Sequence, residues 1–129
     1  MARRKNRTLT ELELEIMRIV WATEKATVGD LSEALEDAGR PLALPSIRTM
    51  LGILQKKGYV KRRRGGRGYS YRASVPAGQA KKRILKDLID RAFDGSASNL
   101  VAALVSEGMV DADDLAKARR LIRDEEGRV

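Results

Sequence analysis

The chain contains no cysteine and no histidine among its 129 residues. The lack of cysteine excludes a disulfide framework and a thiolate metal site. The lack of histidine removes the usual general base and the commonest metal ligand. A carboxylate-only enzyme is the catalytic class that remains, but no pair of carboxylates marks a cleft. The sequence therefore predicts that the protein is not an enzyme and has no metal or cofactor.

Long apolar runs are also missing. The longest one, Leu100–Val105, is far too short to cross a bilayer. The opening residues MARRKNRTLT are basic, but no apolar segment follows them as it does in a secretory signal. We therefore expect a cytoplasmic protein that does not insert into membranes.

Positive charge is concentrated in the first part of the chain. The net charge is +8. Residues 1–74 contain 16 basic and 8 acidic residues, whereas residues 75–129 contain 10 of each. Solubility alone does not require this segregation, so the first part is expected to bind a polyanion.

The stretch PSIRTMLGILQKK, residues 45–57, has the periodicity of an amphipathic helix. Pro45 suits the first helical position and Gly58 suits the residue that ends a helix. One face is apolar, and the other is polar with no acidic residue; the apolar face holds Ile47, Met50, Leu51 and Leu54. Taken alone, this pattern is also typical of an ordinary surface helix.

Two β-type runs follow the helix, Tyr59–Arg64 and Tyr69–Ala73, around a GGRG turn. A polar-faced helix followed by a basic hairpin is typical of a winged helix that binds DNA. The arginines of the hairpin are therefore expected to contact phosphate. The alternative is a solvated strand edge that is protected against pairing with another chain.

Two helices precede this unit. Thr10 and Glu13 predict a capping box at the start of a helix that runs to about Ala22. Thr27 is expected to cap a second helix, Val28–Ala38, which completes a helix-turn-helix with residues 45–57. Residues 1–8 form a basic arm, expected to be mobile, that either contacts phosphate or has no role.

Three helical patterns follow Pro76: Gln79–Phe93, Asn99–Glu107 capped by Ser96 or Ser98, and a helix capped by Asp111. The nearby acidic residues fit the cap and the helix dipole without a metal. About fifty residues rarely form a stable core alone, so these helices are expected to pack against a second copy. The predicted dimerisation residues are Leu85, Leu88, Ile89, Phe93, Leu100, Val101, Leu104, Leu115, Leu121 and Ile122.

The fold class predicted is mainly α with a small β-hairpin, with an N-terminal winged helix-turn-helix and a C-terminal three-helix dimerisation domain. The boundaries expected are 1–8 for the arm, 9–75 for the winged helix and 76–129 for the dimerisation domain. The predicted DNA-binding residues are Ser46, Arg48, Thr49, Gly52, Gln55, Lys56, Arg62, Arg63, Arg64 and Arg67.

These residues are expected to have different tasks on DNA. Arg48 is expected to read guanine, Gln55 adenine, and Thr49 either a thymine methyl or a phosphate. Ser46, Lys56 and the hairpin arginines are expected to bind phosphate, and Gly52 to allow close approach to the duplex. A twofold dimer would place two such helices on a palindromic site.

The chain resembles the penicillinase repressors of BlaI/MecI type. The residues that carry the resemblance are LTELELEIMRIVW at 9–21, PSIRTMLGILQKKGYVKRRRGGRGYSYRA at 45–73 and FDGSASNLVAALVSEG at 93–108. The resemblance implies a homodimeric repressor that binds palindromic operator DNA ahead of resistance genes. It also implies a membrane sensor protease as a partner, with cleavage of the repressor near Ala103–Leu104.

The family often has Asn-Phe at the cleavage position, where this chain has Ala-Leu. Relief of repression by proteolysis, by a ligand or by dimer dissociation therefore stays open. Two other functions also stay open: a winged-helix adaptor that binds proteins, and a non-specific chromosome-associated protein.

Overall fold

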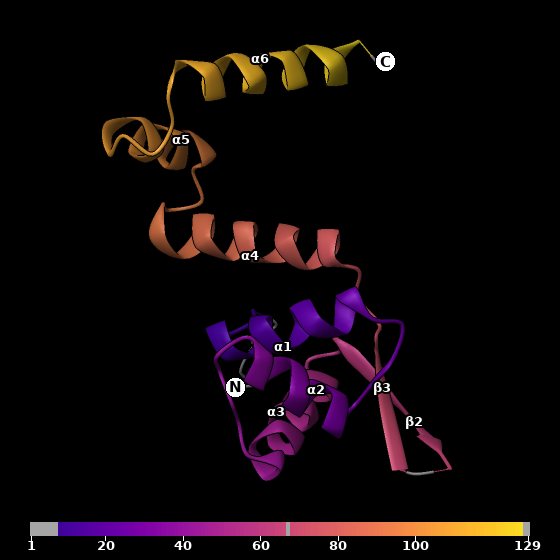
Figure 1. The fold of residues 1–129 in the computed structure, drawn as a ribbon. Coiled ribbons are helices and arrows are strands. Elements are labelled where there is room, and N and C mark those ends of the chain that lie inside the picture. The colour runs from indigo at the N-terminus through magenta and orange to yellow at the C-terminus, as the bar shows by residue number, and fades with distance from the viewer. Residues whose placement is uncertain (1–7, 67, 128–129) are drawn as a thin grey trace, which may run out of the picture. The chain divides into compact units, whose positions relative to one another are not determined.

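In a computed structural model, which describes residues 8–66 and 68–127, the fold is mainly α with one small sheet, as predicted (Figure 1). The elements are α1 (Glu11–Ala22), β1 (Ala26–Thr27), α2 (Val28–Asp37), α3 (Leu44–Lys56), β2 (Val60–Gly65), β3 (Gly68–Ala73), α4 (Ala77–Ala92), α5 (Ala97–Ser106) and α6 (Ala112–Glu126). They fall into two compact units, Met1–Leu85 and Lys86–Val129. The predicted basic arm lies outside the described residues except for Thr8.

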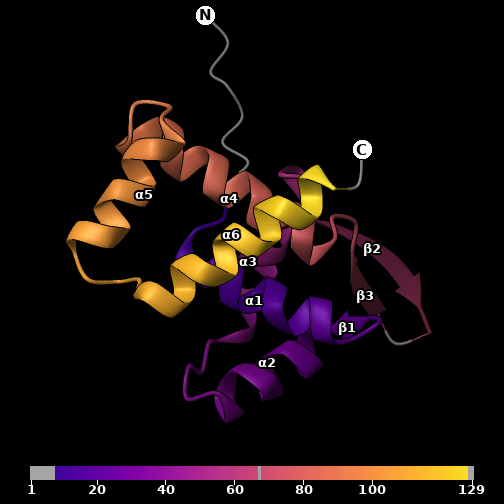
Figure 2. The same ribbon diagram turned by 90° about the horizontal axis from the view of Figure 1, so that it is seen from above.

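The core of the first unit lies among α1, α2 and α3. Helix α2 contacts both α1 and α3, and Figure 2 shows it beside α1. Each helix buries residues spaced three or four apart, because that spacing places them on one face. The fully buried apolar ones are Ile16, Met17 and Val20 of α1, Leu31 and Leu35 of α2, and Ile47, Leu51 and Leu54 of α3. Burying each such side chain stabilises the fold by about 1.5–3 kcal/mol.

Local capping fixes where the first two helices begin. Thr10 and Glu13 form the predicted capping box of α1, and Thr27 forms one with Asp30 at α2. Helix α3 differs from the prediction. It begins at Leu44 rather than Pro45, so the proline occupies the second position, and Ala43 provides no side-chain cap.

The sheet is antiparallel in the order β1-β3-β2. Strand β1 was not predicted from the sequence, which indicated only the two strands of the hairpin. Two residues carry no strand signal of their own, and β1 exists because Ala26 and Thr27 pair with Tyr71 and Ser70. The hairpin also pairs further than predicted, as far as Gly65 and Gly68.

The hairpin is fastened to the end of α3. Gly58 has φ +83° and turns the chain out of the helix, as predicted. The backbone of Tyr59 then accepts a hydrogen bond of 2.8 Å from the amide of Ser74. The Ser74 hydroxyl donates to the carbonyl of Gly58, also at 2.8 Å. These bonds fix the direction in which the hairpin leaves α3.

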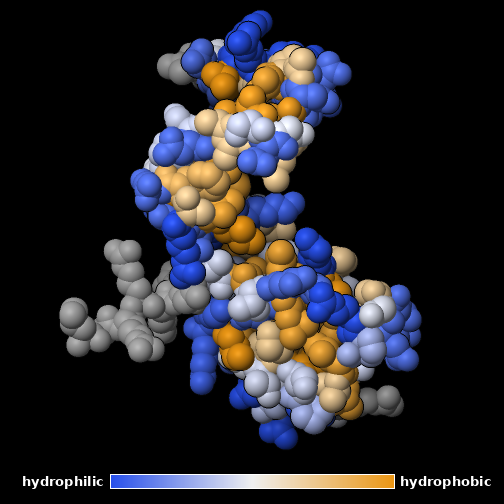
Figure 3. Space-filling model, turned by 90° about the vertical axis from the view of Figure 1, so that its left-hand side faces the viewer, coloured by the Kyte–Doolittle hydropathy of each residue, from blue (hydrophilic) through white to orange (hydrophobic). Residues whose placement is uncertain are grey.

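The second unit contains the end of α4 with α5 and α6. Helix α4 begins two residues earlier than predicted, directly after Pro76. Ser96, rather than Ser98, caps α5, and Asp111 caps α6 as predicted. No described residue of α5 or α6 is buried. Apolar surface is accordingly visible over these helices in the upper part of Figure 3. None of the described helices combines the length and apolar character needed to span a membrane.

Candidate nucleic-acid interface

The polar face of α3 points away from the core. Burial of Ile47, Leu51 and Leu54 turns the opposite side of the helix to solvent. The predicted helix residues are all exposed: Ser46, Arg48, Thr49, Gly52, Gln55 and Lys56. The hydroxyl of Thr49 donates to the carbonyl of Pro45 at 3.0 Å, so its hydrogen is used inside the helix. Its methyl group remains available for an apolar contact.

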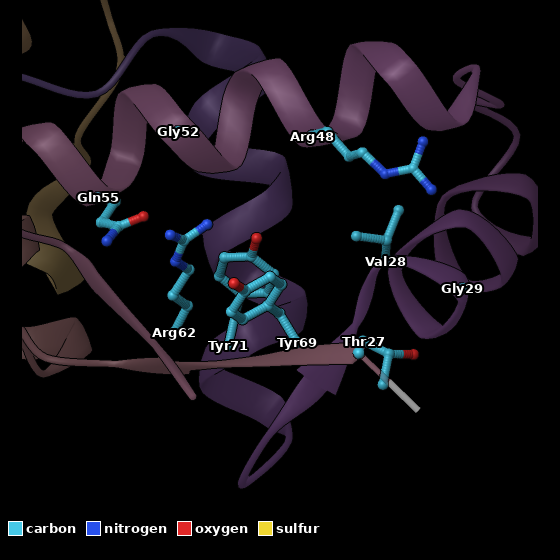
Figure 4. Close-up of a pocket in the computed structure, with 10 residues that line it drawn as sticks. Thr27, Val28, Gly29, Arg48, Gly52, Gln55, Arg62, Tyr69 and Tyr71 are labelled. Carbon is cyan, nitrogen blue, oxygen red and sulfur yellow. The ribbon is translucent and has the colours of Figure 1, made fainter. Parts of the chain in front are cut away.

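A groove separates α3 from the wing, by which we mean the hairpin β2–β3. Its volume is about 790 Å³. The lining comes from α3, the start of α2 and the hairpin, and consists of Thr27, Val28, Gly29, Arg48, Gly52, Gln55, Arg62, Gly68, Tyr69 and Tyr71 (Figure 4). No acidic residue is among them. The groove therefore offers cationic and amide side chains, the groups that bind phosphates and base edges.

The positive charge of this groove is available to a partner. Arg48 extends from α3 toward Val28 at the start of α2, and Arg62 points from β2 toward α3 (Figure 4). Neither forms an ion pair within the described part of the chain. By contrast, Arg40 pairs with Glu11 and Glu15, at 3.3 and 3.1 Å.

Gly52 lies in the middle of α3 and lines the groove. A Cβ atom added there would meet no heavy atom within 4 Å. Glycine inside a helix costs about 1 kcal/mol relative to alanine. Because no described neighbour requires the missing side chain, packing inside the protein gives no reason for this glycine. Close approach of a partner to α3 does give one.

The hairpin divides its basic residues between two faces. Side chains alternate along a strand, and Arg62 and Arg64 pair in register with Tyr71 and Tyr69. This face carries the two tyrosines that line the groove. Arg63 falls on the other face, together with Lys61 and Arg72, which are register partners. The predicted Arg67 lies outside the described residues. From the sequence the arginines were predicted as one group and the tyrosines were not predicted to line the site, although strand alternation was the available signal.

Lys57 has an internal role that the sequence reading did not identify. Its Nζ donates to Glu13 Oε1 at 2.8 Å and to the carbonyl of Thr8 at 2.9 Å. The Glu13 side chain is only 1% exposed. Burial raises the pKa of Glu13, but hydrogen bonds from Lys57 and Thr10 outweigh it and hold the pKa below the ordinary 4.5. Lys57 thus ties the end of α3 to the start of α1.

The predicted dimerisation residues lie on α4, α5 and α6, apart from Phe93, which follows α4. All are exposed or half-buried: Leu85, Leu88, Ile89, Phe93, Leu100, Val101, Leu104, Leu115, Leu121 and Ile122. Ala103 and Leu104, the predicted cleavage position, lie inside α5 and are half-buried. The described residues contain no group of histidine, cysteine or acidic side chains that could hold a metal ion.

Several relatives match over 88% of this chain. An uncharacterised 16.5 kDa protein in the ptsI 3′ region of Latilactobacillus sakei is 30% identical, and the match spans 77% of its length. The methicillin resistance regulatory protein MecI of Mammaliicoccus sciuri is 24% identical, with 92% of its length covered.

Solved structures share the fold. The solution structure of the DNA-binding domain of the repressor BlaI gives a TM-score of 0.51 at 23% identity, covering 60% of this chain and 93% of that domain. The complex structure of hsRosR-S4 gives a TM-score of 0.53 at 19% identity, and the match covers 93% of this chain and 91% of the hsRosR-S4 chain. The family model for the penicillinase repressor matches residues 9–124. The chain therefore belongs to the penicillinase repressor family, a family of DNA-binding transcriptional repressors rather than of enzymes.

Proposed function

We propose that this repressor binds operator DNA sequence-specifically with α3 in the major groove. The observation that carries the proposal is the acid-free groove between α3 and the wing, in which neither Arg48 nor Arg62 forms an ion pair with a described residue. Arg48 offers the planar fork of donors that recognises guanine, and Gln55 the amide that recognises adenine. Gly52 lets the backbone of the helix come close to the duplex.

The remaining basic residues supply affinity rather than sequence choice. Lys56, Arg63 and Arg64 are exposed, and each phosphate that they neutralise releases a counterion. Ser46 donates to a phosphate near the start of α3, and Arg67, which lies outside the described residues, adds one further positive charge. This part of the binding weakens as salt rises.

The functional form is a homodimer on a palindromic operator. The apolar side chains of α5 and α6 lack a buried partner within the described chain, with Leu121 66% and Ile122 58% exposed. Monomeric proteins seldom leave so much apolar surface in contact with water. A second copy would cover it and would present a second α3 to the other half-site.

The regulated genes are of the β-lactam resistance type, and repression is relieved by a membrane sensor protease or by another signal. The relative MecI is described as a methicillin resistance regulatory protein. If proteolysis is the signal, cleavage at Ala103–Leu104 requires α5 to unwind locally, because both residues lie within that helix. Immunoblotting of host cells after β-lactam exposure tests this, and an uncut repressor that has nevertheless left its operator would point to a different signal.

The test of the main proposal uses the full chain and duplex DNA. Wild-type protein is used to enrich duplexes of about 30 base pairs, roughly three helical turns, from a random library. Its affinity for the enriched duplex and for a scrambled one is then measured at several salt concentrations. We expect at least about 10³-fold discrimination and a fall in both affinities with salt. Equal binding to every duplex would favour the chromosome-associated protein, and no binding would favour the adaptor.

A further inference from the structure

Arg62 and Tyr69 form a stacked pair inside the groove. The guanidinium carbon of Arg62 lies 4.3 Å from the centre of the Tyr69 ring. The two residues are diagonal neighbours across the hairpin, since Arg62 is in register with Tyr71 and Arg64 with Tyr69. Diagonal positions on one face of a sheet are within reach of aromatic and long side chains. The antiparallel register therefore brings the pair together.

Stacking leaves the useful groups of this arginine free. A guanidinium on an aromatic ring uses its flat face, so its N–H donors still point outward in one plane. Arg40 and Arg91 differ, because their nitrogens lie within 3.3 Å of carboxylate oxygens, which also neutralise their charge. No described carboxylate pairs with Arg62. It keeps both its full charge and its hydrogen-bonding capacity.

The Arg62 side chain lies in the groove beside the ring. Figure 4 shows the Arg62 side chain leaving the hairpin toward α3, with its end between Gln55 and the two tyrosines. Tyr71 is only 7% exposed and belongs to the core, whereas Tyr69 is 41% exposed. Burial thus accounts for Tyr71 but leaves much of the Tyr69 ring in contact with solvent. Among the described residues, the Arg62 guanidinium lies over this ring.

We propose that Tyr69 is a positioning residue that orients Arg62 to clamp a backbone phosphate of the DNA bound by α3. An arginine that is already ordered loses less conformational freedom on binding, so preorganisation raises affinity without a new contact. The planar fork matches two oxygens of one phosphate. This inference rests on the proposed DNA-binding function and separates Arg62 from Arg63, which lies on the other face of the hairpin.

The experiment is a double-mutant cycle on DNA affinity. It uses Tyr69→Leu, Tyr69→Phe, Arg62→Ala and the double variant Tyr69→Leu/Arg62→Ala. Arg63→Ala, alone and with Tyr69→Leu, is the matched control from the other face. Each variant binds the enriched and the scrambled duplex over a range of salt. Circular dichroism melting checks that each one folds.

Removing the ring and removing the charge are expected to differ. Tyr69→Leu should weaken binding about 2- to 30-fold, the span of cation–π interactions from exposed to desolvated sites, with an unchanged salt slope. Tyr69→Phe keeps the ring and should stay within about two-fold of wild type. Arg62→Ala should cost about 10- to 150-fold on both duplexes and lower the salt slope by about 0.9.

The decisive comparison is between the loss of DNA affinity that Tyr69→Leu causes in the Arg62→Ala variant and the loss that it causes in the Arg63→Ala variant. If Tyr69 acts through Arg62, Tyr69→Leu costs nothing further once Arg62 is alanine, but keeps its full cost beside Arg63→Ala. Additive losses in the Arg62→Ala background would overturn the proposal. So would a Tyr69→Phe loss equal to that of Tyr69→Leu, which would indicate a contact made by the hydroxyl. An Arg62→Ala loss confined to the enriched duplex would overturn the phosphate assignment in favour of base reading. Failure of the wild-type protein to bind any duplex would instead refute the proposed function itself.

Discussion

Replacing Gly52 by alanine is expected to make the folded protein more stable and its DNA binding weaker. The two effects have separate causes. In the free protein a Cβ atom at this position meets nothing within 4 Å, so the substitution introduces no clash. On DNA the same methyl group would project from the face of α3 that lines the groove.

The gain in stability follows from helix propensity. Alanine is favoured over glycine inside a helix by about 0.8–1.0 kcal/mol. For a unit of this size, 1 kcal/mol raises the melting temperature by about 4–8 °C. Thermal unfolding followed by circular dichroism at 222 nm, the usual helix wavelength, measures the shift.

The loss of affinity follows from the close approach that glycine permits. Forcing an extra methyl group into a well-packed contact costs about 1–3 kcal/mol, or roughly 5- to 150-fold in the dissociation constant. Gly78→Ala is the control, because Gly78 is also helical and also has open space around it. It lies outside the groove and should leave DNA affinity unchanged.

A Gly52→Ala variant that binds the enriched duplex as tightly as wild type would refute the close-approach argument. A Gly52→Ala variant that melts at a lower temperature than wild type would refute the stability argument, since it would show that Gly52 has a structural role in the folded protein. The predicted signature is therefore a rise in melting temperature together with a loss of affinity.

The other predictions concern base recognition, stability of the fold and dimer formation. Arg48→Ala should cost about 1–3 kcal/mol on the enriched duplex and relax sequence choice, and equal losses on the scrambled duplex would remove Arg48 from base reading. Lys57→Met should destabilise the fold by about 3 kcal/mol in urea unfolding at neutral pH, because it leaves the Glu13 carboxylate buried without its cation, and a loss near zero would contradict this. The pKa of Glu13 in the folded protein lies below 4.5, so its ionised form stabilises the fold fully above about pH 5. This stabilisation disappears as the pH falls through the folded pKa. If the free energy of unfolding of wild type depends on pH no more steeply than that of Glu13→Gln, this prediction is wrong. The double variant Leu121→Asp/Ile122→Asp should sediment as a monomer and wild type as a dimer, because both side chains are exposed apolar groups. A wild-type protein that sediments as a monomer would contradict the proposed homodimer.

Features that depend on neighbouring residues could be predicted from the sequence alone. The capping boxes at Thr10, Thr27 and Asp111 each link a residue to the one three positions later. The buried face of α3 follows from a period of 3.6 residues. The division of charge between the two parts of the chain needs only counting. These signals were sufficient for the winged-helix fold and for the exposed polar face of α3.

Features that depend on distant residues were decided by the tertiary structure. Strand β1 exists only because Ala26 and Thr27 meet β3, more than forty positions away. Lys57 and Glu13 are 44 positions apart, and although the helical period separates Lys57 from its exposed neighbour Lys56, nothing local identifies Glu13 as its partner. Trp21 donates to the carbonyl of Val75 at 2.8 Å across 54 positions. Such pairs form when packing brings together elements whose own sequences do not specify each other.

The candidate interface combines both kinds of information. Sequence determined its chemistry: an acid-free helix face and a run of arginines in a hairpin. Tertiary structure decided which of these residues share one groove, because strand register sorts alternate side chains onto opposite faces. Arg62 thereby lies against Tyr69 in the groove while its neighbour Arg63 does not, a distinction that composition and local periodicity do not contain.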